Sequence, residues 1–198
     1  MNVRLEKTWF WSSGMVYDNE YKINDYTATV NFLTVSDDSY QQNIAYERVK
    51  YWISNVIESA VLIHEGSDLI PAFVSTGQRV LILPDTPVDQ IIGIMLYLKL
   101  NSICENRMVI TDVKISSLLG DRMVYIHSHG EAIGNLEQDG WWLDPRPTWA
   151  QIKGRKKSGK IIAINREQEW ADLGLSWEEN TERKNSVVFA DFVKNENK

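Results

Sequence analysis

Cysteine and histidine are both scarce in this chain. Cys104 is the single cysteine, and only three histidines occur in 198 residues. One cysteine excludes an internal disulfide, so we expect a reducing compartment and assign the protein to the cytoplasm. Because Cys104 ends an apolar segment, we interpret it as a small buried hydrophobic residue and not as a nucleophile.

The chain also lacks an excess of positive charge and long apolar runs. Lys and Arg number 21 against 27 Asp and Glu, which leaves a net charge of −6. This balance disfavours nucleic acid and anionic lipid as partners. The longest strongly apolar stretch, residues 91–98, is too short to span a bilayer, and the charged N-terminus does not resemble a secretory signal. We therefore expect no membrane partner.

Hydrophobic residues make up 43% of the chain, enough for a well-packed core, and eight of them are Trp. Residues 3–17 and 26–35 are rich in β-branched and aromatic residues, with alternation in the second segment, which predicts two strands. The polar residues 18–25 between them are predicted to be a connection. The two strands should form a long antiparallel hairpin.

Two helices are predicted after this hairpin. The first covers residues 40–64, with apolar residues at helical spacing and N-cap candidates at 37–39. The second covers residues 87–104, where Thr86, Pro87 and Asp89 have the spacing of a capping box and the segment is apolar on most of its circumference. Between the helices we expect a loop over 66–78 and a short buried strand over 79–84.

Two more strands are predicted at 108–117 and 121–129, joined by a turn at Gly120 and Asp121. The order β-β-α-α-β-β indicates an α+β core domain, residues 1–130, with an antiparallel sheet and both helices on one face.

The remainder, residues 131–198, is predicted to be an aromatic, β-rich C-terminal extension. In it we expect strands at 161–164 and 186–193 and a short helix at 166–173 that Gly174 ends.

This order of elements is that of the tunnelling fold, and residues 5–130 resemble the 6-pyruvoyl-tetrahydropterin synthase and 6-carboxytetrahydropterin synthase family. The resemblance lies in TWFWSSGMVYD with YTATVNFLTVSDD, in IHEGSD, and in PDTPVDQIIGIM. It implies a zinc enzyme with one His on the first strand and an HxH on the second. These regions contain no His here, and the nucleophilic Cys is absent. His64 matches a catalytic His but lacks its paired Asp, so the family's zinc ligands and its reaction do not carry over.

The most specific chemical motif is His127-Ser128-His129. Residues i and i+2 of a strand lie on the same side, so two imidazoles at this spacing can chelate zinc. The third ligand would be His64, Glu131 or Asp139. The alternative is a pair of strand-end histidines near solvent. Zinc is the one cofactor that the sequence suggests.

Three weaker candidates remain. The basic run KGRKKSGK places positive charge where a phosphate or nucleic-acid backbone can bind, or it is a solvated hairpin turn. Its charged residues are Lys153, Arg155, Lys156, Lys157 and Lys160. The rings of Trp141, Trp142 and Trp149 can stack on a ligand, or they attach the extension to the core. His64, Glu65 and Asp68 form an acid–base cluster or a helix C-cap.

Two functions are consistent with these observations. The first is a non-catalytic protein, binding a small purine- or pterin-like ligand or a protein partner on a degenerate pterin-synthase-like scaffold. The second is a zinc-dependent hydrolase or lyase that uses His127 and His129. We favour the first because the metal ligands of the family are missing. Free sheet edges and the aromatic extension predict a homo-oligomer.

Overall fold

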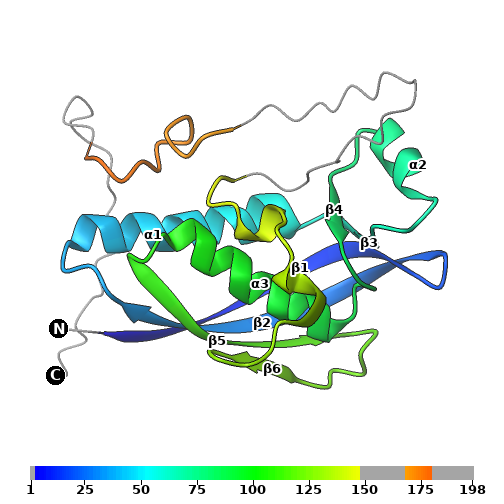
Figure 1. Ribbon diagram of the computed structural model, residues 1–198, viewed down its shortest axis with the longest axis horizontal. Helices are drawn as coiled ribbons and strands as arrows, with labels where there is room; N and C mark the ends of the chain where they lie inside the picture. The colour runs from blue at the N-terminus through cyan, green and yellow to red at the C-terminus, as the bar shows by residue number, and fades with distance from the viewer. Residues whose placement is uncertain (1–2, 148–167, 180–198) are drawn as a thin grey trace, which may run out of the picture.

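A computed structural model describes residues 3–147 and 168–179. A twisted six-stranded sheet in the order β4-β3-β1-β2-β5-β6 supports a layer of helices on one face (Figure 1). The α+β class and the placement of the two long helices on one face are as predicted. The sheet is mixed and not purely antiparallel, because β3 pairs parallel with both β1 and β4.

The first two strands form a longer hairpin than predicted. β1 (Arg4–Tyr17) and β2 (Glu20–Thr34) pair in register along their whole length. The predicted connection over 18–25 was wrong: the turn consists of Asp18 and Asn19, both at positive φ, and residues 20–25 belong to β2. Asp and Asn tolerate this backbone conformation, which a two-residue hairpin turn needs. Alternate residues of β2 face the core and the outer surface.

The predicted helix over 40–64 divides into three elements. α1 (Ser39–Trp52) begins at the N-cap Asp38 and continues into a π-helical turn, η1 (Ile53–Ile57). Ser59, at a φ of 61°, then turns the chain into β3 (Val61–His64), and β4 (Val80–Leu83) pairs with β3. The helix prediction was wrong from residue 58 onward because a short, fully apolar run fits a buried parallel strand as well as a helix.

The second half of the core follows the sequence more closely. α2 (Ile70–Ser75) lies within the predicted loop, and α3 (Asp89–Cys104) matches the second predicted helix. β5 (Met108–Ser117) has the predicted bounds, whereas β6 (Tyr125–Ser128) is shorter than predicted. The capping box was wrong: Val88 is the N-cap residue of α3, and no side chain caps this end.

The core lies between the sheet and the two long helices. Trp52 of α1 and Leu96 of α3 are completely buried there, with Tyr26 and Phe32 of β2 beneath them. Side chains on most sides of α3 are buried, which explains why the helix is apolar around most of its circumference.

The extension packs onto the helices in its described part. It contains two 3₁₀ turns, η2 (Gly134–Glu137) and η3 (Trp141–Leu143). Residues 170–174 form a turn and not the predicted helix, with Gly174 at positive φ. The predicted strands at 161–164 and 186–193 lie outside the described residues. The division into domains at residue 130 remains a prediction, although Trp141 and Trp170 belong to the core cluster of the first domain.

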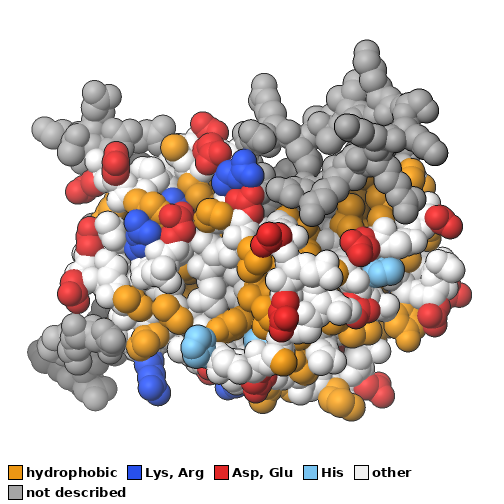
Figure 2. All heavy atoms as spheres, in the orientation of Figure 1, with side chains coloured by type: hydrophobic (Ala, Val, Ile, Leu, Met, Phe, Trp, Pro, Cys, Tyr) orange, Lys and Arg blue, Asp and Glu red, His pale blue; other side chains and the backbone are white. Residues whose placement is uncertain are grey.

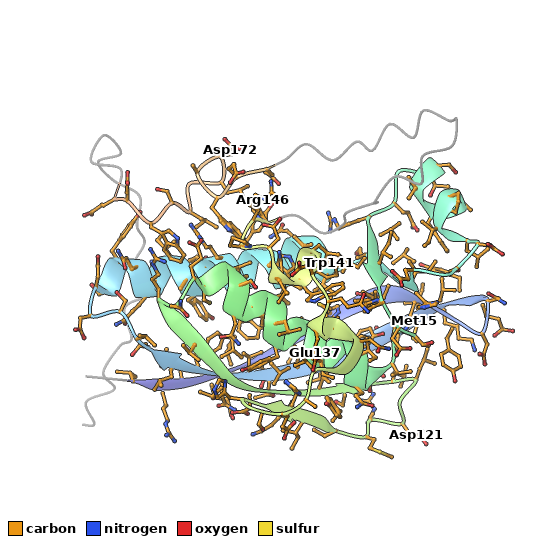
Figure 3. The ribbon with its side chains drawn as sticks, viewed as in Figure 1. Met15, Asp121, Glu137, Trp141, Arg146 and Asp172 are labelled. Carbon is orange, nitrogen blue, oxygen red and sulfur yellow. The ribbon has the colours of Figure 1, made fainter. Side chains whose placement is uncertain are left out.

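Lys99 fastens the extension to α3. Its side chain is fully buried, and Nζ donates to the carbonyl oxygens of Trp141, Asp144 and Arg146 at 3.2, 2.7 and 2.8 Å. Figure 3 shows Trp141 and Arg146 along the segment that crosses the helical layer. Burial lowers the pKa of Lys99 to about 7. Three acceptors around Nζ favour the ammonium, because a neutral amine has only two protons to donate.

Contacts of Arg48 hold residues 168–179 against the helices. The Arg48 guanidinium lies 3.6 Å from the ring centre of Trp177 and 5.0 Å from that of Trp170. Arg48 also donates to the Leu175 carbonyl at 2.9 Å and pairs with Glu105 at 2.8 Å. A guanidinium between two indoles combines cation–π attraction with burial of apolar surface. None of the helices in the described residues is long and apolar enough to cross a membrane.

Candidate functional site

The larger of two cavities described here opens at the N-terminal end of α3. It has a volume of about 570 Å³ and lies between this helix end, the first two strands and the β5–β6 connection. Its apolar walls include Met15, Leu119 and Met123, and its polar groups include Asn24 and Asp89. Hydrophobic side chains reach the surface along the lower edge of the molecule, where the β5–β6 connection lies (Figure 2).

Two charged residues line this cavity, Lys22 and Asp89. Lys22 is paired with Glu20 at 2.9 Å, so Asp89 gives the cavity its chemical character. It is the first residue of α3 and is half-buried. No donor among the described residues bonds its carboxylate, and the helix end makes no use of it as a cap. The N-terminal end of a helix is a favourable position for a carboxylate, which can lie there without a protein partner.

Gly120 allows the carboxylate to occupy this position. A Cβ atom on Gly120 would lie 2.5 Å from Asp89 Oδ2 and 3.0 Å from Ser117 Oγ. A side chain at this position would therefore displace the Asp89 carboxylate, while the backbone angle of Gly120 is not itself unusual. The Gly120 N–H donates to Ser117 Oγ at 3.1 Å, which holds the connection beside the carboxylate.

Met15 and Asn24 of the first two strands form the floor of the site, and the buried Tyr26 contacts Met15 beside them. Asn24 Nδ2 and the Tyr26 hydroxyl lie 3.5 and 3.7 Å from Met15 Sδ. Asn24 Oδ1 accepts from the Leu119 N–H at 2.9 Å, which ties β2 to the β5–β6 connection. Burial, with a smaller contribution from Asp89, raises the pKa of Tyr26. Its hydroxyl is therefore protonated near neutral pH.

This floor does not suit zinc. The resembled family draws its zinc ligands from the same two strands, but here those strands contribute a thioether, an amide and a protonated phenol. Zinc in proteins is held by imidazole, thiolate and carboxylate groups. Across the residues that the structure describes, no group of three His, Cys, Asp or Glu side chains is placed to hold a metal ion.

The predicted metal pair lies elsewhere, on and just after β6. His127 is fully buried, and neither ring nitrogen has a hydrogen-bond partner among the described residues. Its ring meets that of Tyr97 edge-on at 4.7 Å, and its Nδ1 lies 3.5 Å from the Glu131 carboxylate. His129 Nδ1 is 2.8 Å from the Tyr97 hydroxyl. His64 does not join this pair within coordination reach, so the three-histidine site is not assembled.

His64 is the last residue of β3 and not the end of a helix. Its Nδ1 accepts a hydrogen bond from the Gly66 N–H at 3.3 Å, which closes the turn after the strand. The predicted acid–base cluster at a helix terminus therefore lacks its helix. Glu65 and Asp68 lie in this turn region.

Trp141 and Trp142 are buried in the core and their indole N–H groups donate to the carbonyls of Ile82 and Leu136. The attachment of the extension is the role that these contacts support. Trp149 and the basic residues of the run at 153–160 lie outside the described residues, so their predicted roles remain predictions.

The residues that line the main cavity were not predicted as a site. Asp89 was interpreted as a capping residue, and Asn24 was placed in a connection. The available signal was a charged residue at the start of an otherwise apolar helix, which is as typical of a cap as of a ligand contact.

Comparisons with known proteins found similar solved structures at low sequence identity. No family model and no curated protein matches this chain. Its structure is similar to that of the uncharacterized protein WS1659 from Wolinella succinogenes, with a TM-score of 0.47 and 11% identity, over 65% of this chain and 99% of that one.

Two further similar structures are 6-pyruvoyltetrahydropterin synthases from malaria parasites. The Plasmodium vivax protein has a TM-score of 0.43 and 8% identity, over 64% of this chain and 97% of its own. The Plasmodium falciparum protein has a TM-score of 0.39 and 15% identity, over 64% and 96%. No residue role is transferred from these proteins to this chain.

Proposed function

We propose that this protein binds a small, planar nitrogen heterocycle of the pterin or purine kind in the cavity at the start of α3, without transforming it. The unpaired Asp89 carboxylate is the observation that carries this proposal. A half-buried carboxylate with no protein donor needs a partner that supplies protons for hydrogen bonds.

The charge and shape of that partner follow from the lining. Two parallel N–H donors on one ring edge match a carboxylate in the way that a guanidinium does, with charge-assisted hydrogen bonds. The exposed amide of Gln90 and the hydroxyl of Ser117 add neutral hydrogen-bonding groups beside Asp89. A ring edge with an amino group next to a ring N–H meets all of these contacts.

The walls favour a flat and largely apolar body. Tyr17 and Tyr125 line the cavity together with the aliphatic side chains of Val88, Leu119 and Val124. Aromatic side chains bind planar rings by offset stacking or edge-to-face contact. A volume of about 570 Å³ lies within the usual range for small-molecule sites and exceeds what a single bicyclic ring requires.

Isothermal titration calorimetry with a pterin, guanine, adenine and uracil tests this proposal. We expect binding of the pterin or guanine, because both carry the amino and ring N–H edge that Asp89 would contact. Asp89→Asn keeps the size of the side chain and removes its charge, so affinity should fall by about tenfold or more, the value of a charge-assisted hydrogen bond.

Asp121→Asn is the matched control. Asp121 is exposed at the tip of the β5–β6 connection, as Figure 3 shows, and Asn is well tolerated at its positive φ. Its substitution should leave affinity unchanged. Failure of every heterocycle to bind, or equal affinity in Asp89→Asn and wild type, would contradict the proposal. Chromatographic recovery of the ligand unchanged after incubation is expected for a non-catalytic protein.

A further inference from the structure

A second cavity lies on the opposite face of the sheet and has a different character. Its volume is about 370 Å³. Phe10, Ser12, Asp25, Thr27 and Ser116 line it from three adjacent strands, and the buried residues Trp11, Tyr26 and Ser117 of the same strands also contribute to its wall. Residues of β2 alternate between the two faces of the sheet, and Asp25 and Thr27 are on the face away from the helices, whereas Asn24 and Tyr26 face the core. The exposed side chains of this cavity are therefore on the outer face of the sheet, although Ser117 lines both cavities.

The strand register arranges these side chains in two rows. Phe10 of β1 is opposite Thr27 of β2, and Thr27 is opposite Ser116 of β5. In the next row Ser12 is opposite Asp25. One aromatic ring is thus flanked by hydroxyl groups and a carboxylate on a regular, hydrogen-bonded surface, so the positions of these groups are set by the backbone and not by a loop.

The polar groups have hydrogen-bonding capacity that the protein does not use. Ser12 Oγ donates to Asp25 Oδ1 at 2.6 Å, which leaves the lone pairs of Ser12 and the second Asp25 oxygen as acceptors. The hydroxyls of Thr27 and Ser116 bond to no other described protein group, so each offers a donor and acceptors.

The apolar part of the cavity is an exposed platform. The Phe10 side chain is 75% exposed, and Leu118, which also lines the cavity, is 51% exposed. Both stand beside hydroxyl-bearing side chains. A flat ring exposed next to hydroxyls and a carboxylate matches a ligand with an apolar C–H face and a rim of hydroxyl groups.

We propose that this second cavity binds a monosaccharide in its pyranose form. The C–H face of the sugar lies on Phe10, where carbon-bound hydrogens meet the negative face of the aromatic ring. The sugar hydroxyls donate to Asp25 and exchange hydrogen bonds with Ser12, Thr27 and Ser116. A cavity of about 370 Å³ accommodates one such ring, at the lower end of the range for small-molecule sites.

The charged groups around the cavity favour a neutral polyol over an ion. Asp25 and Glu58 are acidic and Arg122 is basic, and all three are exposed to solvent. Arg122 would repel a simple cation, and the two carboxylates would repel an anion. Hydroxyl groups, which both donate and accept, suit either sign of charge.

Amide NMR spectra recorded while glucose, galactose and mannose are added test this proposal. We expect millimolar binding of at least one sugar, with shifts concentrated at Thr27 and Ser116. Phe10→Ala should weaken it about tenfold through loss of the platform, and Phe10→Tyr should restore it. Asp25→Asn should also weaken binding. Both positions are exposed, so neither substitution should change the thermal unfolding temperature.

Ile23→Ala is the control, because Ile23 is a large exposed residue of the same strand face that does not line the cavity. Its sugar affinity should equal that of the wild type. Absence of shifts with all three sugars would overturn the proposal, as would shifts that persist in both Phe10→Ala and Asp25→Asn. Tighter binding of methylamine or glycine at the same residues would also overturn it, in favour of an ionic ligand.

Discussion

At the scale of single residues, His127 is a buried imidazole whose charge the fold does not accommodate. Burial lowers the pKa of His127, and the nearby Glu131 carboxylate opposes this only in part. The unfolded chain, with an ordinary histidine pKa of about 6.5, binds a proton at a pH where the folded chain does not. The free energy of unfolding should therefore have its full value above a pH of about 6.5 and should decrease as the pH falls below it.

His127→Leu should remove most of this dependence, because leucine fills the site without titrating. Urea unfolding at a series of pH values between 5 and 8, roughly the range in which histidine titrates, measures it. His64→Gln, at a half-exposed position, should keep the slope of the wild type. The same slope in His127→Leu as in the wild type would assign the dependence to other groups.

At the scale of elements, one lysine of α3 holds the segment that follows the sheet. Lys99 donates to three carbonyls of residues 141–146, and these acceptors would be left without a donor in Lys99→Met. Leaving buried polar groups unpaired is costly, so we expect a loss of about 3 kcal/mol of stability. Urea denaturation monitored by tryptophan fluorescence measures this loss.

Lys50→Met provides the comparison for Lys99→Met. Lys50 lies in an exposed pair with Glu47 on α1, a kind of contact worth about 0.5 kcal/mol or less. A loss at Lys99 as small as that at Lys50 would mean that the carbonyls of residues 141–146 find water or other donors.

At the scale of the whole molecule, the sheet ends in two short edge strands. On the β4 side the Ile82 carbonyl accepts from the Trp141 indole, so part of this edge is covered. On the β6 side Met123, Val124 and Ile126 are 75%, 57% and 48% exposed. Among the described residues no strand lies beyond β6, and an apolar sheet edge of this kind invites pairing with another chain. We therefore expect a homo-oligomer that forms through the β6 edge.

Light scattering at concentrations on the order of tens of micromolar tests this expectation. The double variant Met123→Glu, Val124→Glu should be monomeric, because it places charge in a contact that must lose water. Ile23→Glu, on a different part of the surface, should leave the assembly intact. A monomeric wild type would contradict the prediction, and an oligomer that survives the double variant would assign the contact to another surface.

The sequence predicted correctly those elements whose local pattern is typical of one kind of secondary structure only. α3 is long and apolar between clear ends, and β5 alternates between turn signals, so both were found at or within two residues of their bounds. The long first hairpin and the layer of helices on one face followed from the order of the elements.

Other features depended on which segments meet in space. Residues 61–64 became a strand because β1 and β4 offered parallel partners on both sides, a long-range pairing that no local pattern contains. His127 and His129 share a spacing that suits a metal, but Tyr97 bonds one of them and packs against the other.

The candidate sites were decided by tertiary structure as well. The sequence by itself determined the strands of the first hairpin, β5, the apolar helix and the presence of Asp89 at its start. Only the tertiary structure placed Gly120, Asn24 and Asp89 around one cavity, and Phe10 with Asp25 on the opposite face of the sheet. The reason is physical: hydrophobic periodicity records which side of an element is buried, whereas a binding site is made where polar ends of distant elements converge.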